Sequence, residues 1–251
     1  MNAEIRNAKG ERLDYSFHDA PGGNSSVVVI GHGVTANKDR PFVEALAMGM
    51  ATVGVPALRF SFAGNGASEG SFEECCITKE VGDLGAVLDA LPGKQVIYVG
   101  HSMGGAVGVI RAARDERIRG LVSLAGMVHT AEFANREFGD VTPGAGSMWD
   151  KPECPLSQAF VDDMNEIGSV TEYAPHITVP WLLVHGVSDD VVPIDESREI
   201  HAFANEPKEL FEIPECDHVF DAFECPDALP AMVSKATSWV MPLALAPASG
   251  T

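Results

Sequence analysis

The sequence predicts a single α/β domain in which a mainly parallel β-sheet is covered by helices on both faces. Short apolar, β-branched runs alternate along the chain with helix-like segments, which is the pattern of parallel strands joined by helical crossovers. The length of 251 residues suits one large domain better than two. No apolar run approaches the roughly 18–20 residues of a membrane span.

The elements are expected in a regular order. Residues 5–7 and 13–18 are predicted to form an N-terminal hairpin around Lys9-Gly10. Strands are then expected at residues 27–30, 53–60, 95–99, 120–124, 179–184 and 209–213. Helices are expected at residues 39–51, 78–91, 105–113, 194–203 and 228–240. Asp39 is expected to cap the first helix, with Pro41 in its first turn. Residues 244–251 are small and contain proline, so we expect a frayed end.

Residues 127–170 interrupt this alternation. A structureless loop of that length is unusual inside a compact domain. The sequence therefore predicts a core formed by residues 1–126 and 171–251, with residues 127–170 as a small inserted cap over the carboxyl ends of the strands, where ligands bind in open α/β sheets. The side chains expected to line a substrate pocket under this cap are Phe133, Phe138, Met148 and Trp149. The alternative is that the segment only packs against the main domain.

The most informative motif is Gly-His-Ser-Met-Gly at residues 100–104, which reads G-x-S-x-G. A buried strand is predicted before it and a helix rich in small residues after it. Strand, sharp turn and helix together are the context of a nucleophile elbow, in which the central serine is exposed above the strand ends. Ser102 is therefore the predicted nucleophile.

A second copy of the same pattern lies at residues 66–70, with Ser68 at its centre. It stands well beyond the end of the strand predicted to finish at residue 60, in a stretch rich in Gly, Asn, Ser and Glu. No helix of small residues follows it. Because the motif requires the strand–turn–helix context, Ser68 is predicted to be a loop serine.

A serine hydroxyl needs a base that takes its proton, and that base needs a carboxylate to hold its tautomer. His218 follows the last predicted strand and is the expected base. His101 lies inside the elbow and is expected to point elsewhere. His185 lies at a strand end and is expected to be a structural hydrogen-bonding residue.

The carboxylate is expected between His185 and Pro193, where a strand ends and the next helix begins. Asp189 and Asp190 both stand there, at the carboxyl edge of the predicted sheet. The chain order of serine, acid and histidine fits either residue. We favour Asp189, and the alternative interpretation of Asp190 is a solvated loop acid.

Two backbone N–H groups must also face the oxygen on which negative charge develops. Met103, directly after the nucleophile, is expected to supply one of them. The second is expected from the Gly-His-Gly-Val-Thr loop at residues 31–35, and Val34 is the favoured donor.

The amino-acid composition restricts the classes of binding partner that are expected. The formal net charge is −19, which argues against nucleic acid or anionic membranes as partners and mildly disfavours polyanionic substrates. The five cysteines are odd in number and lack C-x-x-C spacing, so no metal or cofactor is expected. The first residues lack an apolar signal core, and a cytoplasmic location is expected. The expected partner is a small-molecule ester, and a homo-oligomer stays open.

Taken together, these motifs resemble the α/β-hydrolase superfamily over roughly residues 27–240. The resemblance rests on residues 32–35, 59–68, 100–104, 185–193 and 217–218. Within that superfamily the chain is similar to small bacterial carboxylesterases, which include cinnamoyl and feruloyl esterases, and to serine-aminopeptidase-like hydrolases.

The resemblance implies an α/β-hydrolase fold, a triad of Ser102, Asp189 and His218, and an oxyanion hole from Val34 and Met103. One departure is Ser61, where these enzymes usually carry Asp. Since that residue is outside the triad, the expected chemistry is unaffected.

The expected function is hydrolysis of small soluble esters, short-chain acyl or hydroxycinnamoyl, through an acyl-enzyme. The alternatives are an amidase or aminopeptidase-like hydrolase, an acylglycerol lipase and, less favoured, a non-catalytic binding module on the same fold. A dinucleotide site is disfavoured, because residues 37–40 separate the glycines from the next helix and Arg59 stands where a carboxylate is needed. Dehalogenase or epoxide hydrolase chemistry would need a carboxylate at position 102.

Overall fold

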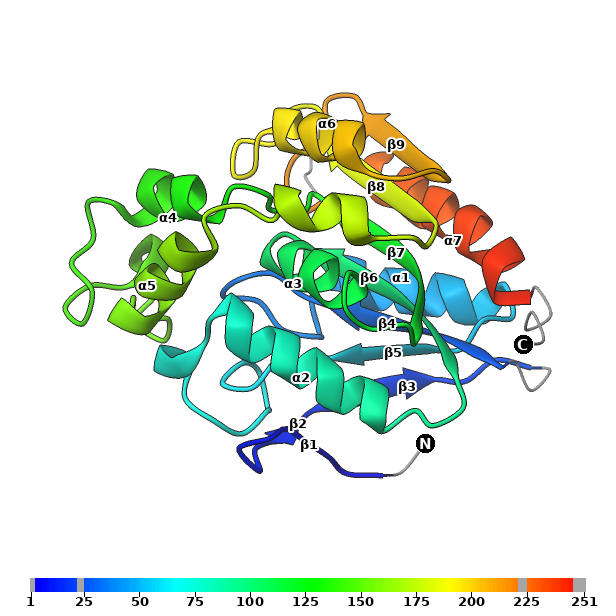
Figure 1. Ribbon diagram of the computed structural model, residues 1–251, viewed down its shortest axis with the longest axis horizontal. Helices are drawn as coiled ribbons and strands as arrows, with labels where there is room; N and C mark the ends of the chain where they lie inside the picture. Colours follow the sequence, from blue (N-terminus) through cyan, green and yellow to red (C-terminus); the bar gives the residue numbers. More distant parts are fainter. Residues whose placement is uncertain (1–2, 22–24, 221–224, 246–251) are drawn as a thin grey trace.

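The computed structural model describes residues 3–21, 25–220 and 225–245 and contains a seven-stranded sheet of order β3-β5-β4-β6-β7-β8-β9 (Figure 1). The edge strand β3 runs antiparallel to β5, and the other neighbouring strands run parallel. The strands are β3 (Tyr15–His18), β4 (Ser26–Gly31), β5 (Ala57–Phe60), β6 (Gln95–His101), β7 (Ile118–Leu124), β8 (Trp181–Gly186) and β9 (Lys208–Ile213). The predicted fold class, a mainly parallel sheet in an α/β domain, is confirmed.

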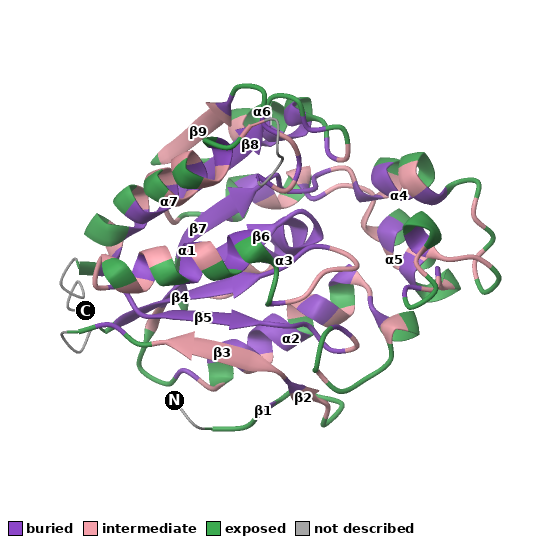
Figure 2. Cartoon of the chain, turned by 180° about the vertical axis from the view of Figure 1, so that it is seen from behind, coloured by how far each residue is buried: buried purple, intermediate pink, exposed green. Residues whose placement is uncertain are grey.

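Helices cover both faces of this sheet, as Figures 1 and 2 show from opposite sides. On one face lie α1 (Pro41–Thr52) and α7 (Ala228–Leu245). On the other lie α2 (Ile77–Asp89), α3 (Met103–Ala112) and α6 (Ile194–Phe203). Every residue of β4 is buried, because this strand is inside the sheet and both of its faces are covered.

The N-terminal hairpin is smaller than the sequence predicts. β1 (Ile5–Arg6) pairs antiparallel with β2 (Arg12–Leu13), and these two strands form a separate small sheet. β3 leaves the hairpin and pairs with β5 at the edge of the main sheet instead. The residues predicted to form one strand of a hairpin therefore belong to two sheets.

Two further boundaries differ from the prediction for local reasons. β5 begins at Ala57, because Gly54 adopts a φ of +85° and Pro56 has no N–H to donate. Asp39 does not cap α1. Its carboxylate binds Lys38 at 2.9 Å and also pairs with Arg59, and the helix begins at Pro41 without a side-chain cap. Of the end predicted to be frayed, residues 244–245 are helical, and residues 246–251 lie outside the described residues.

Residues 127–170, the predicted insertion, lie between β7 and β8. This segment contains α4 (Thr130–Phe138), the short 3₁₀ helix η2 (Met148–Asp150) and α5 (Gln158–Ile167), and a second 3₁₀ helix, η3 (Thr171–His176), leads back towards β8. In Figure 1 α4 and α5 project to one side of the sheet. The buried apolar side chains of the insertion are continuous with the core on the α2 and α3 face. No helix in the described part of the chain is long and apolar enough to cross a membrane.

Two carboxyl groups are buried on α2, one helical turn apart. Asp83 accepts hydrogen bonds from the Asn7 side chain at 2.7 Å and from the Ala63 backbone N–H at 2.8 Å, which ties the N-terminal segment and the loop after β5 to α2. Glu80 has a buried Oε2 with no hydrogen-bond partner among the described residues. Burial, reinforced by the charge of Asp83, raises the pKa of Glu80 well above its usual value.

We predict that Glu80→Gln changes the pH dependence of stability. The unfolded wild type releases the Glu80 proton near pH 4.5, whereas the folded protein retains it to a higher pH. Wild type therefore loses stability relative to the variant as the pH rises above about 4.5, by up to about 1.4 kcal/mol per pH unit, until the pKa of the folded state is reached. Urea unfolding of both proteins between pH 4 and pH 8 measures the difference.

The control is Glu73→Gln, which removes an exposed carboxylate four residues before Ile77, the first residue of α2. Its stability relative to wild type should not follow the same curve. A constant difference between Glu80→Gln and wild type across this pH range would contradict the prediction.

Candidate active site

Ser102 lies at the turn between β6 and α3 with φ 53° and ψ −120°, a left-handed conformation that costs a non-glycine residue about 1–3 kcal/mol. Backbone hydrogen bonds hold it there. Ser102 N–H donates to the carbonyl of Leu124 at 3.0 Å, and the carbonyl of Ser102 accepts from Gly105 at 2.8 Å and from Met127 at 3.0 Å. This is the geometry expected of a nucleophile elbow.

Glycines around the turn are required by contact. A Cβ on Gly100 would lie 2.1 Å from the carbonyl oxygen of Gly104, and one on Gly104 would lie 2.5 Å from that of His32. A Cβ on Gly33 would lie 2.8 Å from Cβ of Ser102 and 3.3 Å from its Oγ. The start of α3 therefore rests directly on the loop that follows β4, and that loop passes directly beside Ser102.

Asp189 is the carboxylate bonded to His218. Asp189 Oδ2 lies 2.8 Å from Nδ1 of His218 and 3.1 Å from Nε2 of His185, and Asp189 Oδ1 accepts from the N–H groups of Val191 at 2.9 Å and Val192 at 2.8 Å. Burial alone would raise the pKa of Asp189, but the hydrogen bonds from His185 and His218 and the charge of His218 hold that pKa below its ordinary value. The carboxylate is thus charged at neutral pH.

Asp190 is exposed and forms no hydrogen bond or ion pair among the described residues. His185 is buried, and besides Asp189 it contacts Ser197 Oγ at 2.7 Å and the carbonyl of Val192 at 2.9 Å. It has the structural hydrogen-bonding geometry that the sequence predicts.

His101 has a contact that the sequence does not reveal. Its Nε2 donates to the backbone carbonyl of His218 at 2.9 Å, and the two imidazole rings lie 4.7 Å apart between centroids. Burial, and then the charge of His218, lowers the pKa of His101 well below its usual value, so the ring is neutral. His101 therefore supports the loop that carries His218. The sequence signal for this contact is the position of His101 at the end of a buried strand, next to the predicted nucleophile.

The loop after β4 is held by a second neutral imidazole. Burial lowers the pKa of His32 to about 4. Its Nδ1 donates to the carbonyl of Gly33 at 2.8 Å, and its Nε2 accepts from the N–H of Phe62 at 3.1 Å. Val34 follows in this loop, while Met103 is the first residue of α3, where backbone N–H groups have no partner within the helix.

A cavity of about 280 Å³ lies over Ser102. The loop after β4, the elbow, the insertion and the loops after β8 and β9 all contribute to its wall. The lining residues are Gly33, Val34, Thr35, Ala36, Arg40, His101, Ser102, Trp149, Lys151, Val191, His218 and Val219. Ser102 and His218, far apart in the sequence, thus line one cavity, and Asp189 lies behind His218.

The cap residues predicted to line this cavity require a correction. Trp149 does line it, but Phe133, Phe138 and Met148 are almost fully buried and are absent from the cavity wall. The rings of Phe133 and Phe138 lie 6.0 Å apart between centroids, and Trp149 covers Phe138 at 4.9 Å. The insertion must fill its own core, and its apolar side chains are used for that.

Ser68 forms no part of the site. Its Oγ donates to the carbonyl of Ser61 at 2.7 Å and accepts from the N–H of Asp14 at 2.8 Å. The hydroxyl thus links the loop after β5 to the chain before β3, as expected of a loop serine.

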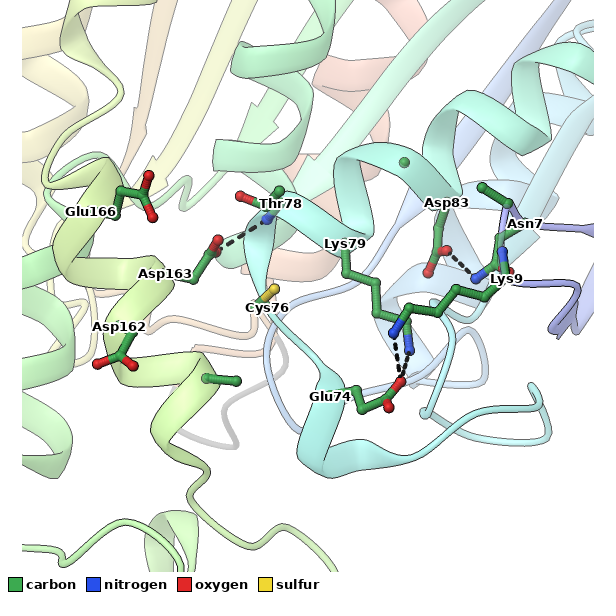
Figure 3. Close-up of a pocket in the computed structure, with 13 residues that line it drawn as sticks. Asn7, Lys9, Glu74, Cys76, Thr78, Lys79, Asp83, Asp162, Asp163 and Glu166 are labelled. Atoms are coloured by element: carbon green, nitrogen blue, oxygen red, sulfur yellow. Dashed lines mark hydrogen bonds and ion pairs between the residues drawn. The ribbon is translucent and has the colours of Figure 1, made fainter.

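A second cavity, of about 470 Å³, lies between the N-terminal hairpin, α2 and α5 (Figure 3). None of its lining residues belongs to the Ser102 cavity. Lys9 and Lys79 both bind Glu74, at 2.9 and 3.4 Å, and Asp163 accepts from the N–H of Thr78 at 3.1 Å. Among the described residues, no group of three or more His, Cys, Asp or Glu side chains is arranged to hold a metal ion.

A family model described as the alpha/beta hydrolase fold matches residues 26–152, and the chain therefore belongs to this family. YfhR of Escherichia coli K12 is 32% identical over 137 residues, which are 54% of this chain and 41% of YfhR. Palmitoyl-protein thioesterase ABHD10 of Rattus norvegicus is 26% identical over 162 residues, 59% of this chain and 54% of ABHD10. The matched part of this chain spans about half of these relatives or less.

Solved structures share the fold across nearly the whole chain. Est1E of Butyrivibrio proteoclasticus, with ferulic acid bound, superposes with a TM-score of 0.84 at 22% identity, over 96% of this chain and 99% of Est1E. Mouse ABHD10 superposes with a TM-score of 0.77 at 17% identity, over 96% of this chain and 98% of that chain.

We predict that Asp189→Asn lowers turnover of a soluble ester by about 10⁴-fold, because the amide favours the wrong tautomer of His218. Asp190→Asn is the matched control, and it should change turnover by less than about 3-fold, since its exposed side chain has no hydrogen-bond or ion-pair partner among the described residues. The measurement is kcat for 4-nitrophenyl butyrate at equal folded concentration. If Asp190→Asn were the damaging substitution, the acid would have to be reassigned.

Substitutions at Trp149 and Phe138 distinguish a residue that lines the cavity from one that packs in the core of the cap. Trp149→Ala should change the ratio of kcat/KM for 4-nitrophenyl acetate to that for 4-nitrophenyl hexanoate, since Trp149 lines the cavity. Phe138→Ala should instead lower the unfolding free energy by about 3–5 kcal/mol with little change in that ratio, because it leaves a hole in the cap core. If the ratio of the two kcat/KM values were unchanged in Trp149→Ala, the cap would have no part in selecting the acyl chain.

Proposed function

We propose that the protein is a serine carboxylester hydrolase that cleaves small soluble esters through an acyl-enzyme. One observation carries the proposal. Ser102, held in a left-handed turn at the end of β6, lines the same cavity as His218, and His218 is hydrogen-bonded to the buried carboxylate of Asp189. A nucleophile, a base and an acid that orients the base are the parts that acyl transfer requires.

The proposed reaction has two halves. Ser102 Oγ attacks the ester carbonyl while His218 Nε2 takes its proton, and the same nitrogen then protonates the departing alcohol. Asp189 keeps the proton of the neutral imidazole on Nδ1 and stabilises the imidazolium that forms. Water, deprotonated by His218, then attacks the acyl-enzyme, and the acid is released when Ser102 regains its proton. The N–H groups of Val34 and Met103 would face the negative oxygen in both halves.

The size of the cavity supports small substrates. A volume of about 280 Å³ is just below the range of roughly 300–1,000 Å³ for small-molecule pockets. Short acyl and hydroxycinnamoyl esters fit this volume better than long acyl chains. The fold shared with Est1E, which is described with ferulic acid bound, makes hydroxycinnamoyl esters a natural test substrate.

We predict that Ser102→Ala lowers hydrolysis of 4-nitrophenyl butyrate and methyl ferulate by on the order of 10⁶-fold and abolishes labelling by a fluorophosphonate probe. Ser68→Ala is the control and should retain both, because its hydroxyl only joins two loops. Labelling that persists in Ser102→Ala, or that maps to Ser68, would overturn the assignment. Faster hydrolysis of emulsified 4-nitrophenyl palmitate than of the short esters would identify a lipase instead.

A further inference from the structure

Two basic side chains line the Ser102 cavity without a carboxylate partner. Arg40 forms no side-chain hydrogen bond or ion pair among the described residues. Among the described residues, the Lys151 ammonium contacts the hydroxyl of Thr35, at 3.3 Å, and the face of Trp149, with Nζ 5.8 Å from the ring centroid. A cation that faces a substrate cavity and has no counter-charge is available to an anion that enters it.

Arg40 is left unpaired because neighbouring cations occupy the nearest acids along the chain. Asp39 binds Lys38 and Arg59, and Glu44, in the first turn of α1, binds Arg59 at 3.1 Å. The backbone of Arg40 is fixed as the residue before α1, and its carbonyl accepts from the N–H of Glu44 at 3.1 Å. The exposed side chain of Arg40 therefore starts from a fixed backbone position at the cavity.

Lys151 is delivered to the cavity by a tight turn in the insertion. Ser147 and Pro155 form an antiparallel β-bridge at the base of this turn. The N–H of Lys151 donates to the carbonyl of Met148 at 3.1 Å, and the carbonyl of Lys151 accepts from the N–H of Cys154 at 2.9 Å. Trp149 and Asp150 take left-handed backbone conformations, with φ of 47° and 56°. Such conformations in bulky residues persist only where the surroundings impose them, and they gather at functional sites.

This arrangement differs from that of the second cavity. The chain carries 36 acidic and 17 basic residues, so an unpaired cation has many acids available to it. In the second cavity, which is rich in acids, both lysines are paired with carboxylates (Figure 3). The Ser102 cavity has two cations in its wall, and the carboxylate of its triad, Asp189, lies behind His218 and is fully engaged.

From these observations we propose that the Ser102 site is specific for esters that carry one carboxylate a few bonds from the scissile carbonyl, with Arg40 and Lys151 as its binding residues. This rests on the proposed esterase function. The planar guanidinium of Arg40 suits two-point binding of a carboxylate, and Lys151 adds a point charge from a different element of the wall. Val34, Val191 and Trp149 supply apolar contact for the rest of the substrate.

The carboxylate could belong to the acyl group or to the alcohol, and two probe pairs separate these sources. Monomethyl terephthalate and dimethyl terephthalate differ in a charge on the acyl side. 4-Acetoxybenzoate and its methyl ester differ in a charge on the leaving group. In at least one pair we expect kcat/KM for the anion to exceed that for the neutral ester in wild type.

The variants are Arg40→Gln, Lys151→Gln and their combination. Each single substitution should lower kcat/KM for the preferred anion by about 10-fold and change that for its neutral partner by less than about 3-fold. Raising the salt concentration should likewise lower kcat/KM for the anionic ester and leave that for the neutral ester unchanged. The control is Arg119→Gln at the start of β7, outside the cavity. It removes an exposed cation that has no ion-pair partner in the described part of the chain, and it should leave the preference for the anion unchanged.

The proposal is overturned if wild type prefers the neutral ester in both pairs, or if the anion preference survives the double substitution. Calorimetry with Ser102→Ala and monomethyl terephthalate or 4-acetoxybenzoate gives a readout that needs no turnover. If Ser102→Ala binds one of these anions and the binding is lost when Arg40→Gln and Lys151→Gln are added, the anion site is supported. This holds even if wild type cleaves no ester, a result that would refute the esterase function alone. Absence of binding by both anions, with neutral esters still cleaved, refutes the anion site alone.

Discussion

The left-handed turn at Ser102 is the constraint on which the rest of the site depends. The chain must pass from a buried strand into a helix within one residue, and a serine tolerates that conformation only if its surroundings fix it. Its carbonyl accepts two backbone N–H groups and its own N–H is bound to the neighbouring strand. The first turn of α3 then has to lie against the loop after β4, which is possible only because position 104 has no side chain. Ser102 and the loop after β4 are thereby brought together by the same close packing.

Asp189 plays the corresponding part for the charge of the site. Its carboxylate is buried, which by itself favours the protonated form, yet two imidazoles and two backbone N–H groups converge on it. These donors outweigh the desolvation and keep a full negative charge behind His218. The neighbouring imidazoles of His32 and His101 are kept neutral by burial and hydrogen-bond the loops on either side. Negative charge is thus held directly behind His218, where it can stabilise an imidazolium.

The sequence predicts the frame of this site better than its walls. The parallel sheet, the elbow at Ser102 and the residues at positions 189 and 218 follow from local patterns: apolar runs, glycines at a turn, and polar residues just past strand ends. These patterns are informative because the carboxyl ends of parallel strands lie at one edge of the sheet, regardless of the conformation of the loops. The cap gives no such signal. Phe138 and Trp149 are both large aromatic residues in the insertion, and only its three-dimensional packing decides that Phe138 fills the cap core while Trp149 lines the cavity.

The same limit applies to charge. A formal net charge of −19 led to the expectation that polyanionic substrates are disfavoured, and that expectation concerns the field at a distance. At physiological ionic strength the field is screened over about 8 Å, so a small substrate inside the cavity responds chiefly to the groups that line it. There Arg40 and Lys151 dominate, although they are far apart in the sequence and neither belongs to a recognisable motif. An acidic surface around a cationic cavity would discriminate by the number of charges: a ligand with one carboxylate gains the two contacts, whereas a polyanion must hold its further charges against the acidic surface outside.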